Sequence, residues 1–301
     1  MTLARCWRLH GPRDLRLETL QLPTAAAGEV LVETRSSAVS VASELSLYLG
    51  RAGHSGAVQT PGYQSTGTVR NLGADVPASW QGRRVVGTWG HSSHALIRTK
   101  QLIAVPNSVS DRAALAVILG EESMKGVRKL NLPPGSLVLV TGAGLLGLLS
   151  VFNLTRRGHT VHVCEPVVER QELARQLGAA EVWNPGQADG TEVSFALECS
   201  ASPEGFQDLL AKLQPGGRVL VLSDGNWGTL LLSPVFHRKE LIVMASSDGD
   251  DYAAYAHWFW KNVDPLLERL FETGVPASEL PAALQRLNGR RERPISVRLE
   301  W

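Results

Sequence analysis

The clearest candidate for a binding site is a set of three glycines in the spacing Gly-x-Gly-x-x-Gly, at Gly142, Gly144 and Gly147. The apolar run 137–140 before them is typical of a buried strand, and an apolar helical sequence follows. Gly142 permits a tight turn, Gly144 lets the backbone approach a pyrophosphate, and Gly147 allows the helix to pack closely on the strand. In this context the spacing predicts a dinucleotide-binding turn.

Further residues complete the predicted dinucleotide site. Leu145 and Leu146 lie between Gly144 and Gly147, and the helix predicted after Gly147 offers unpaired N–H groups and partial positive charge to phosphates. Glu165 ends the next strand, 23 positions after Gly142, where a carboxylate can bind both ribose hydroxyls and repel a 2′-phosphate. Arg170 argues the other way, because its guanidinium could reach such a phosphate. We predict that these residues bind NAD in preference to NADP; the alternative is a turn that only packs, with Glu165 solvated.

The elements around this turn alternate between strands and helices. Helical sequences stand between apolar, strand-like runs, which lie at 137–140, 160–164, 193–197, 218–222 and 241–245. This alternation indicates a parallel sheet covered on both faces. Residues 113–248 are therefore predicted to form a doubly wound Rossmann domain in an α/β protein.

The first hundred residues have a different character. Strand-like segments are separated by turn signals, and they lie at 15–18, 29–34, 67–70 and 84–87. The tail is predicted to be helical over 255–273 and strand-like at 294–299. A β-rich part and a Rossmann part agree with the two domains expected for 301 residues.

Composition and charge exclude several classes of partner. Hydrophobic residues make up 44% of the chain and charged residues 20%, so a large core can be buried. The net charge of +1 gives no reason to expect binding to nucleic acid or to an anionic membrane. Arg290, Arg291 and Arg293 stand between Gly289 and Pro294, and we interpret this basic run as a solvated loop.

Targeting and redox signals favour the cytoplasm. The N-terminus has no long apolar run behind its first charges, so no signal peptide is predicted. Residues 130–155 lack charges over a length that could span a membrane, but their prolines and glycines indicate loop, strand and turn. Cys6, Cys164 and Cys199 are far apart and form no Cys-x-x-Cys pair. This argues against disulfides and a cysteine zinc site, and a reducing cytoplasm is expected.

Several short motifs, taken in order along the chain, resemble those of the medium-chain dehydrogenase/reductase superfamily, the group of alcohol dehydrogenases and quinone reductases. They lie at 28–32, 61–64, 67–69, 82–85, 142–147, 165–178 and 215–219. The resemblance implies a GroES-like catalytic domain at 1–112, completed by 249–301, around the Rossmann domain inserted at 113–248. It also implies hydride transfer between the nicotinamide and a small-molecule substrate in the cleft between domains, and a homodimer through the sheet edge at 241–245.

The chain departs from the zinc-dependent members of this superfamily at the metal ligands. Ser40 stands where they place a cysteine, Tyr63 replaces the usual histidine, and the third ligand region falls near Ile118. Zinc in proteins is bound by nitrogen, thiolate or carboxylate groups, which these residues do not supply. His91 and His94 have no obvious third partner and are interpreted as a polar loop or a wall of the active site. We therefore expect no zinc and no other metal.

Without zinc, hydroxyl groups would have to polarise the substrate oxygen or move its proton. The resemblance places Ser43 where family members often have a proton-relay serine or threonine, and Tyr63 in the same cleft. Ser40 and Glu44 are neighbours in that wall, so Ser40, Ser43 and Tyr63 are the candidate catalytic residues. The alternative is that they only line or support the pocket. The Ser40–Glu44 pattern and the 61–64 turn resemble the bacteriochlorophyllide a dehydrogenase-like subgroup, whose substrate does not carry over.

These residues lead to one preferred function and two alternatives. The preferred function is a zinc-independent, NAD-dependent oxidoreductase that transfers a hydride between nicotinamide and an alcohol or ketone. A quinone or enone reductase is the first alternative: the missing zinc favours it, and Glu165 weighs against it because many such reductases use NADPH. The second alternative is a dinucleotide-binding protein without catalysis, which the lost metal ligands motivate.

Overall fold

The structure is a computed structural model of the whole chain, and it describes residues 2–51, 56–187, 190–223, 229–289 and 294–301. Packing divides the chain into two compact units. The first unit is Met1–Ile118 together with Tyr252–Trp301, and the second is Leu119–Asp251. The basic run at 290–293 lies outside the described residues. The assignment of a catalytic and a nucleotide-binding domain, with the bounds given above, stays a prediction.

Seven strands form the main sheet in the described part of the first unit. They are β3 (Glu29–Val39), β4 (Ser65–Leu72), β5 (Arg84–Gly87), β6 (His94–Arg98), β7 (Ile103–Ala104), β14 (Gly274–Pro276) and β15 (Val297–Glu300). Their order is β14-β15-β3-β4-β5-β7, and β6 also pairs with β3. Because β15 pairs antiparallel with β3, with Val297 opposite Val39, a strand from the tail completes the N-terminal sheet.

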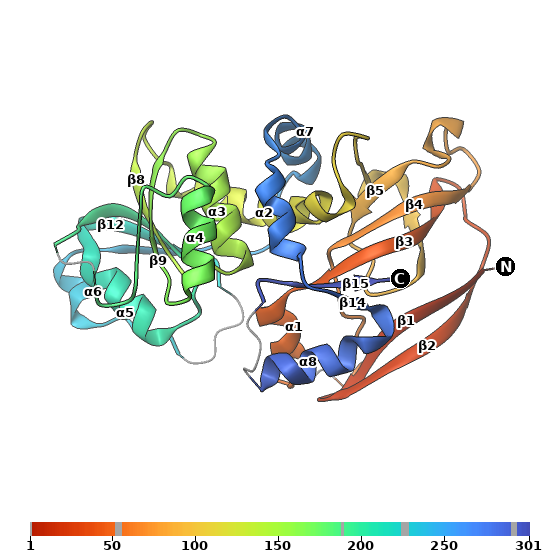
Figure 1. Cartoon of the computed structure of the whole chain (residues 1–301), viewed down its shortest axis with the longest axis horizontal. Coiled ribbons are helices and arrows are strands. Elements are labelled where there is room, and N and C mark those ends of the chain that lie inside the picture. The colour runs from red at the N-terminus through yellow and green to blue at the C-terminus, as the bar shows by residue number, and fades with distance from the viewer. Residues whose placement is uncertain (1, 52–55, 188–189, 224–228, 290–293) are drawn as a thin grey trace. The chain divides into compact units, whose positions relative to one another are not determined.

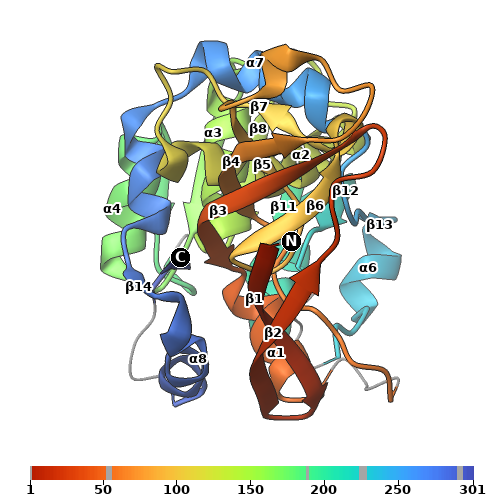
Figure 2. The same cartoon turned by 90° about the vertical axis from the view of Figure 1, so that its right-hand side faces the viewer.

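A hairpin and several helices surround this sheet. They are β1 (Thr2–Gly11), β2 (Asp14–Leu22), α1 (Val41–Tyr48), α7 (Tyr252–Asn262) and α8 (Leu280–Asn288). The hairpin lies beside α1, where the Arg13 N–H donates to the Tyr48 carbonyl at 2.7 Å (Figure 2). Trp7 packs with apolar residues of α1 and α8, and its indole N–H donates to the Ala277 carbonyl at 2.8 Å. These contacts hold α1, the helix that carries Ser43, in place.

The tail differs from the single helix predicted over 255–273. Helix α7 ends at Asn262, and a 3₁₀ turn follows at Pro265–Phe271. Asp264 between them is extended, and its carboxylate accepts the Leu266 N–H at 2.9 Å. The physical reason is Pro265, which lacks a backbone N–H and disfavours helical geometry at the residue before it.

Six parallel strands form the sheet in the described part of the second unit, in the order β10-β9-β8-β11-β12-β13. They are β8 (Leu137–Thr141), β9 (Thr160–Cys164), β10 (Glu181–Trp183), β11 (Val193–Glu198), β12 (Leu213–Val221) and β13 (Ile242–Ala245). Val138, Leu139 and Val140 of the central strand are fully buried. This is the burial expected when both faces of a parallel sheet are covered.

Helices cover both faces of that sheet. They are α3 (Leu145–Thr155), α4 (Val168–Gln176), α5 (Pro203–Lys212) and α6 (Pro234–Arg238). The chain winds outward from β8 in both directions, so α3 and α4 lie on one face and α5 and α6 on the other (Figure 1). The predicted α/β class, a doubly wound parallel sheet with a separate antiparallel β-rich part, is confirmed. Sheets of this kind bind ligands at the carboxyl ends of the strands beside the point where the winding reverses.

A 20-residue helix, α2 (Asp111–Leu130), contains the boundary between the two units. Its first residue is anchored within the first unit, because the Arg84 guanidinium contacts the Asp111 carboxylate at 2.6 Å. Within the described ranges, no helix is both long and apolar enough to cross a membrane.

Candidate functional site

The turn after β8 is shaped by the absence of a side chain at Gly142. Its φ angle is +82°, a conformation that L-residues with a Cβ rarely adopt. A Cβ there would also lie 2.7 Å from the Cα of Ser200, in the loop after β11. On the other side, the Gly142 N–H donates to the Cys164 carbonyl at the end of β9, at 2.8 Å. The turn therefore fits between the ends of the two neighbouring strands only as glycine.

The other two glycines of the motif differ from each other. A Cβ on Gly147 would lie 1.8 Å from the Gly142 carbonyl oxygen, so α3 packs directly against its own turn. A Cβ on Gly144 would meet no described atom within 4 Å, so the space in front of this residue is open. Gly144 is the N-cap of α3, and the first turn of the helix contains no acidic side chain. A phosphate can therefore approach the backbone at Gly144.

Leu145 and Leu146 lie in the first turn of α3, which begins at Leu145 and not after Gly147 as the sequence predicted. N–H groups in the first turn of a helix have no acceptor within the helix, and the helix dipole adds partial positive charge. The first bond within the helix runs from the Leu148 N–H to the Gly144 carbonyl at 2.9 Å. The donor set of this turn thus fits the pyrophosphate of a dinucleotide.

Glu165 is not solvated: only 3% of the residue is exposed. One carboxylate oxygen accepts the Ala143 N–H at 2.6 Å, and the other accepts the Val167 N–H at 2.8 Å. Each oxygen of a carboxylate has a second lone pair, so the group can accept further hydrogen bonds from hydroxyls. Glu165 therefore holds the glycine turn directly. Arg170 lies half-buried in the first turn of the following helix, α4.

Sequence reasoning missed a second acidic residue beside this turn. Glu198 ends β11, the strand on the other side of β8, and it is fully buried. One carboxylate oxygen accepts the N–H groups of Ser200 and Ala201 at 2.7 and 3.1 Å, and the other accepts the Ser223 hydroxyl. Glu198 therefore shapes the loop that faces Gly142. The sequence did contain a signal for Glu198, an acidic residue at the end of a predicted strand. Its place beside the glycine turn could not be predicted, because β11 lies next to β8 only in the folded sheet.

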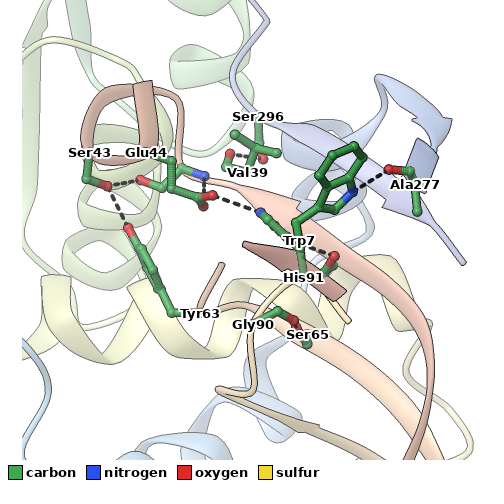
Figure 3. Close-up of polar contacts among 12 residues, drawn as sticks. Trp7, Val39, Ser43, Glu44, Tyr63, Ser65, Gly90, His91, Ala277 and Ser296 are labelled. Carbon is green, nitrogen blue, oxygen red and sulfur yellow. Dashed lines mark hydrogen bonds and ion pairs between the residues drawn. The ribbon is translucent and has the colours of Figure 1, made fainter. Parts of the chain in front are cut away.

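In the first unit, the structure brings Ser40, Ser43 and Tyr63 together. Ser40 is the N-cap of α1, Ser43 lies in its first turn, and Tyr63 lies in the loop before β4. The Ser43 hydroxyl donates to the Ser40 oxygen at 2.7 Å and lies 2.9 Å from the Tyr63 hydroxyl. Figure 3 shows the Tyr63 phenol pointing at Ser43. We call these three side chains the hydroxyl chain.

A buried ionisable pair lies beside the hydroxyl chain. His91 is fully buried and Glu44 is 5% exposed, and Nε2 of the imidazole lies 2.8 Å from Oε2 of the carboxylate (Figure 3). His94 does not take part in this pair; its Nδ1 lies 3.1 Å from the Ser93 hydroxyl.

Among the described residues, no group of three or more His, Cys, Asp or Glu side chains is arranged to hold a metal ion. Ile118 lies buried in α2.

Two further observations bear on the chemistry available in the chain. Burial raises the pKa of Cys6, raises that of Cys164 to about 11, and also raises that of Cys199. The thiols are therefore protonated at neutral pH, and thiolate chemistry is disfavoured.

Gln64, next to Tyr63, is fully buried, and both its amide atoms lack a hydrogen-bond partner among the described residues.

Curated proteins with related sequences are dehydrogenases. The chain is 26% identical over 249 residues to alcohol dehydrogenase notN of Aspergillus sp., covering 69% of this chain and 73% of that protein. It is 22% identical over 313 residues to sorbitol dehydrogenase of Bacillus subtilis, covering 88% and 86%. A 26% identity over 235 residues, 71% of each chain, links it to 2-desacetyl-2-hydroxyethyl bacteriochlorophyllide A dehydrogenase of Cereibacter sphaeroides. No protein-family model matches the chain.

Solved structures share the fold over nearly the whole length. A short chain alcohol dehydrogenase from E. coli CFT073, complexed with NADH, superposes with a TM-score of 0.85 at 18% identity, covering 99% of both chains. An alcohol dehydrogenase from Thermotoga maritima gives 0.84 at 18% identity, covering 100% of both. A protein from Sinorhizobium meliloti 1021 bound to NADP gives 0.87 at 17% identity, again covering 100% of both.

Proposed function

The chain belongs to the medium-chain dehydrogenase/reductase superfamily, and on this premise we propose that it transfers a hydride between NAD and an alcohol or ketone without zinc. Its named relatives are dehydrogenases of this type, so the chain is a nicotinamide-dependent oxidoreductase. The proposal adds the cofactor preference, the substrate class and the route of the proton.

The observation that carries the proposal is the polarity of the hydroxyl chain. A hydroxyl has a single proton to donate, and Ser43 donates its proton to Ser40. The contact between Ser43 and Tyr63 must then have Tyr63 as the donor. All three groups therefore point the same way, and the Tyr63 oxygen can accept a hydrogen bond from a substrate hydroxyl. When an alcohol is oxidised, its proton can move onto Tyr63 while the Tyr63 and Ser43 protons each shift one position along. The half-buried Ser40 then releases its own proton to water, so that each hydroxyl again carries one proton.

The second unit supplies the residues that would hold the cofactor. Gly144 leaves room for the pyrophosphate, Gly142 and Gly147 allow the tight packing of the turn, and Leu145 and Leu146 offer N–H groups at the start of the helix. When bound, the nicotinamide supplies or accepts the hydride. The buried carboxylate of Glu165 accepts ribose hydroxyls and repels a 2′-phosphate, which supports NAD over NADP. Arg170 in the first turn of α4 is the remaining cofactor residue of the proposal.

We also propose that the enzyme is a cytoplasmic homodimer. In its favour, β13 is an edge strand of the parallel sheet, and Ile242 on it is 43% exposed. An exposed apolar edge strand readily pairs with a second copy. Cys6, Cys164 and Cys199 are free thiols, as is usual in a reducing compartment.

One set of measurements tests the proposed activity. Purified protein is titrated with NADH and NADPH, its metal content is measured, and turnover is followed with panels of alcohols, ketones, quinones and enones. We expect tighter NADH binding, no stoichiometric zinc, and turnover of alcohols or ketones that falls in Tyr63→Phe and Ser43→Ala. Turnover of quinones or enones alone would replace the proposal with a reductase of conjugated double bonds. Cofactor binding without any turnover would indicate a non-catalytic protein.

A further inference from the structure

We propose that the buried pair Glu44–His91 is a positioning device for the hydroxyl chain: it fixes the start of α1 and the 61–63 turn relative to each other. The inference rests on the proposed function, because it assigns these two residues a role in presenting Tyr63 and Ser43 to a substrate. Neither residue is placed in contact with the reacting atoms.

On one side, Glu44 holds the beginning of α1. Its Oε1 atom accepts the Ser40 N–H at 2.9 Å, while Oε2 lies 2.8 Å from the His91 imidazole. A glutamate that reaches back to the N-cap N–H satisfies a donor for which the helix has no acceptor. Because Ser40 is the N-cap and Ser43 lies in the first turn of this helix, the Glu44 carboxylate holds the Ser40 backbone beside the turn that carries Ser43.

On the other side, His91 holds the turn that carries Tyr63. The backbone N–H of His91 donates to the Pro61 carbonyl at 2.8 Å. Gly62, with a φ of +91°, lies so close to the imidazole that a Cβ there would be 2.7 Å from Nδ1. The backbone on the N-terminal side of Tyr63 is thus packed against the imidazole ring, and a shift of this ring would move the phenol.

The imidazole is itself held at both nitrogens. A carboxylate only accepts, so Nε2 carries the proton that is shared with Glu44. Nδ1 lies 2.8 Å from the Ser37 hydroxyl on β3, and that oxygen also accepts the Trp301 indole N–H at 2.9 Å. Ser37 belongs to the central strand of the sheet. The pair therefore ties α1 and the 61–63 turn to a rigid element, as a precise site requires.

Because the pair is buried, removing one partner should displace the hydroxyl chain, and the displacement can be measured as a change in turnover. Breaking a buried, hydrogen-bonded pair by removing one partner leaves the other uncompensated, so the side chains rearrange. A displacement of about 1 Å in a catalytic group can lower turnover by about 10²-fold. We expect Glu44→Ala and His91→Ala to lower kcat by about 10- to 100-fold, with little change in substrate KM. The Kd for NADH should stay the same, because the proposed dinucleotide site lies wholly within the other unit.

Conservative and control variants separate positioning from a loss of folding. Gln at position 44 keeps an acceptor for the Ser40 N–H, and its NH₂ can donate to Nε2 if the imidazole adopts the other tautomer. Glu44→Gln should therefore recover most of the turnover that Glu44→Ala loses. Glu33→Gln is the matched control, since Glu33 belongs to the same unit, its side chain is 40% exposed, and it pairs with Arg70. It should leave kcat within about twofold of the wild type.

The decisive experiment is a double-mutant cycle with Tyr63→Phe, combined with NMR of ¹³C-labelled tyrosine. If the pair acts through the hydroxyl chain, Glu44→Ala lowers kcat much less in the Tyr63→Phe variant than in the wild type. In protein that keeps Tyr63, Glu44→Ala should also shift the Tyr63 resonance. An undiminished loss of kcat in the Tyr63→Phe variant, or an unmoved resonance, would overturn the inference. If Tyr63→Phe alone keeps full turnover, the proposed proton route fails and the cycle has no loss to compare. The NMR spectrum of the protein with Tyr63 intact then decides: a shifted Tyr63 resonance in Glu44→Ala supports the positioning role, and an unmoved one overturns it.

Discussion

The glycine turn at 142–147 and the hydroxyl chain of the first unit are built in opposite ways. The turn depends on missing side chains: Gly142 and Gly147 have no room for a Cβ, and the binding groups are backbone N–H donors. The hydroxyl chain depends on side chains whose contacts span long stretches of sequence. Glu44 and His91 are 47 positions apart, and Ser37 and Trp301 are 264 apart.

This difference decides what each site tolerates. A backbone site fails when any atom is added, because the donors sit on the main chain and cannot be moved one at a time. A side-chain site can lose one hydroxyl and keep its fold, since the remaining groups are held by separate contacts. Variants of the glycine turn should therefore weaken or abolish cofactor binding. Variants of the hydroxyl chain should slow turnover while cofactor binding stays intact.

The largest effect is expected for Gly147→Ala. The added methyl group would lie 1.8 Å from the Gly142 carbonyl oxygen, so α3 must shift away from its turn. We expect the free energy of unfolding to fall by about 3 kcal/mol, as for overpacked cores, and NADH binding to be lost. Chemical denaturation and NADH titration measure the two quantities. Wild-type stability in this variant would contradict the packing described.

Gly144→Ala sharpens the comparison, because it adds the same methyl group where no described atom lies within 4 Å. An alanine N-cap is less favourable than a glycine N-cap, so stability should fall by about 1 kcal/mol, well below the loss expected for Gly147→Ala. The Kd for NADH should nevertheless rise by about 100-fold, since the methyl group occupies the approach of the pyrophosphate. Unchanged NADH affinity would argue against a phosphate at this turn.

Tyr63→Phe is the corresponding test in the first unit. It removes one hydroxyl, 2.9 Å from that of Ser43, and leaves the ring in place. Loss of a group that transfers a proton typically lowers turnover by about 10²- to 10⁴-fold. We expect kcat to fall by at least about 10²-fold, with NADH affinity within about twofold of the wild type. Steady-state kinetics and NADH titration test this, and full turnover would remove Tyr63 from the proton route.

Glu165→Gln should have a moderate effect on cofactor choice. The substitution keeps the size of the side chain and removes the charge that opposes a 2′-phosphate. The NH₂ group of the new side chain also faces one of the two backbone N–H donors, so both cofactors should bind more weakly, and the ratio of their affinities isolates the effect of the charge. We expect the ratio of NADPH to NADH affinity to rise by about tenfold, or about 1.4 kcal/mol. Fluorescence titration with both cofactors measures it. An unchanged ratio would mean that Glu165 serves only to hold Ala143 and Val167.

The smallest effect is expected for Gln64→Met. The buried Gln64 amide has no partner in the described structure, and an unsatisfied buried polar group costs about 1–3 kcal/mol. Replacing it with an apolar side chain of similar length should raise the free energy of unfolding by about 1 kcal/mol. Gln81→Met is the control, because the Gln81 amide donates to the Arg70 carbonyl at 2.7 Å. If both variants lose stability equally, Gln64 has a partner such as a buried water.

The sequence was informative where a site is local. The turn at 142–147 could be located because glycine spacing, the preceding strand and the following helix are neighbours in the chain. Glu165 was found by its distance from the turn, although its hydrogen bonds to Ala143 and Val167 were not foreseen. Their roles in binding stay predictions, as do those of the hydroxyl chain.

What sequence reasoning missed depends on tertiary structure. His91 was interpreted as a polar loop residue or a wall of the active site, and Glu44 as a neighbour of Ser40; their pairing follows only from the fold. Glu198 was missed because β11 comes to lie beside β8 only in the sheet. The break between α7 and the following 3₁₀ turn had a local signal in Pro265, which the helical pattern outweighed.

The pairing of β15 with β3 has a consequence for how the chain is made. β3 ends at Val39 and β15 begins at Val297, so 257 residues separate them. At about 5–20 residues per second, a ribosome takes roughly 13–50 s to synthesise them. All of Leu119–Asp251 is made in that interval and can fold first. The part of β3 that pairs with β15, Ser36–Val39, meanwhile has no partner strand on that edge and is exposed to chaperones and to other nascent chains.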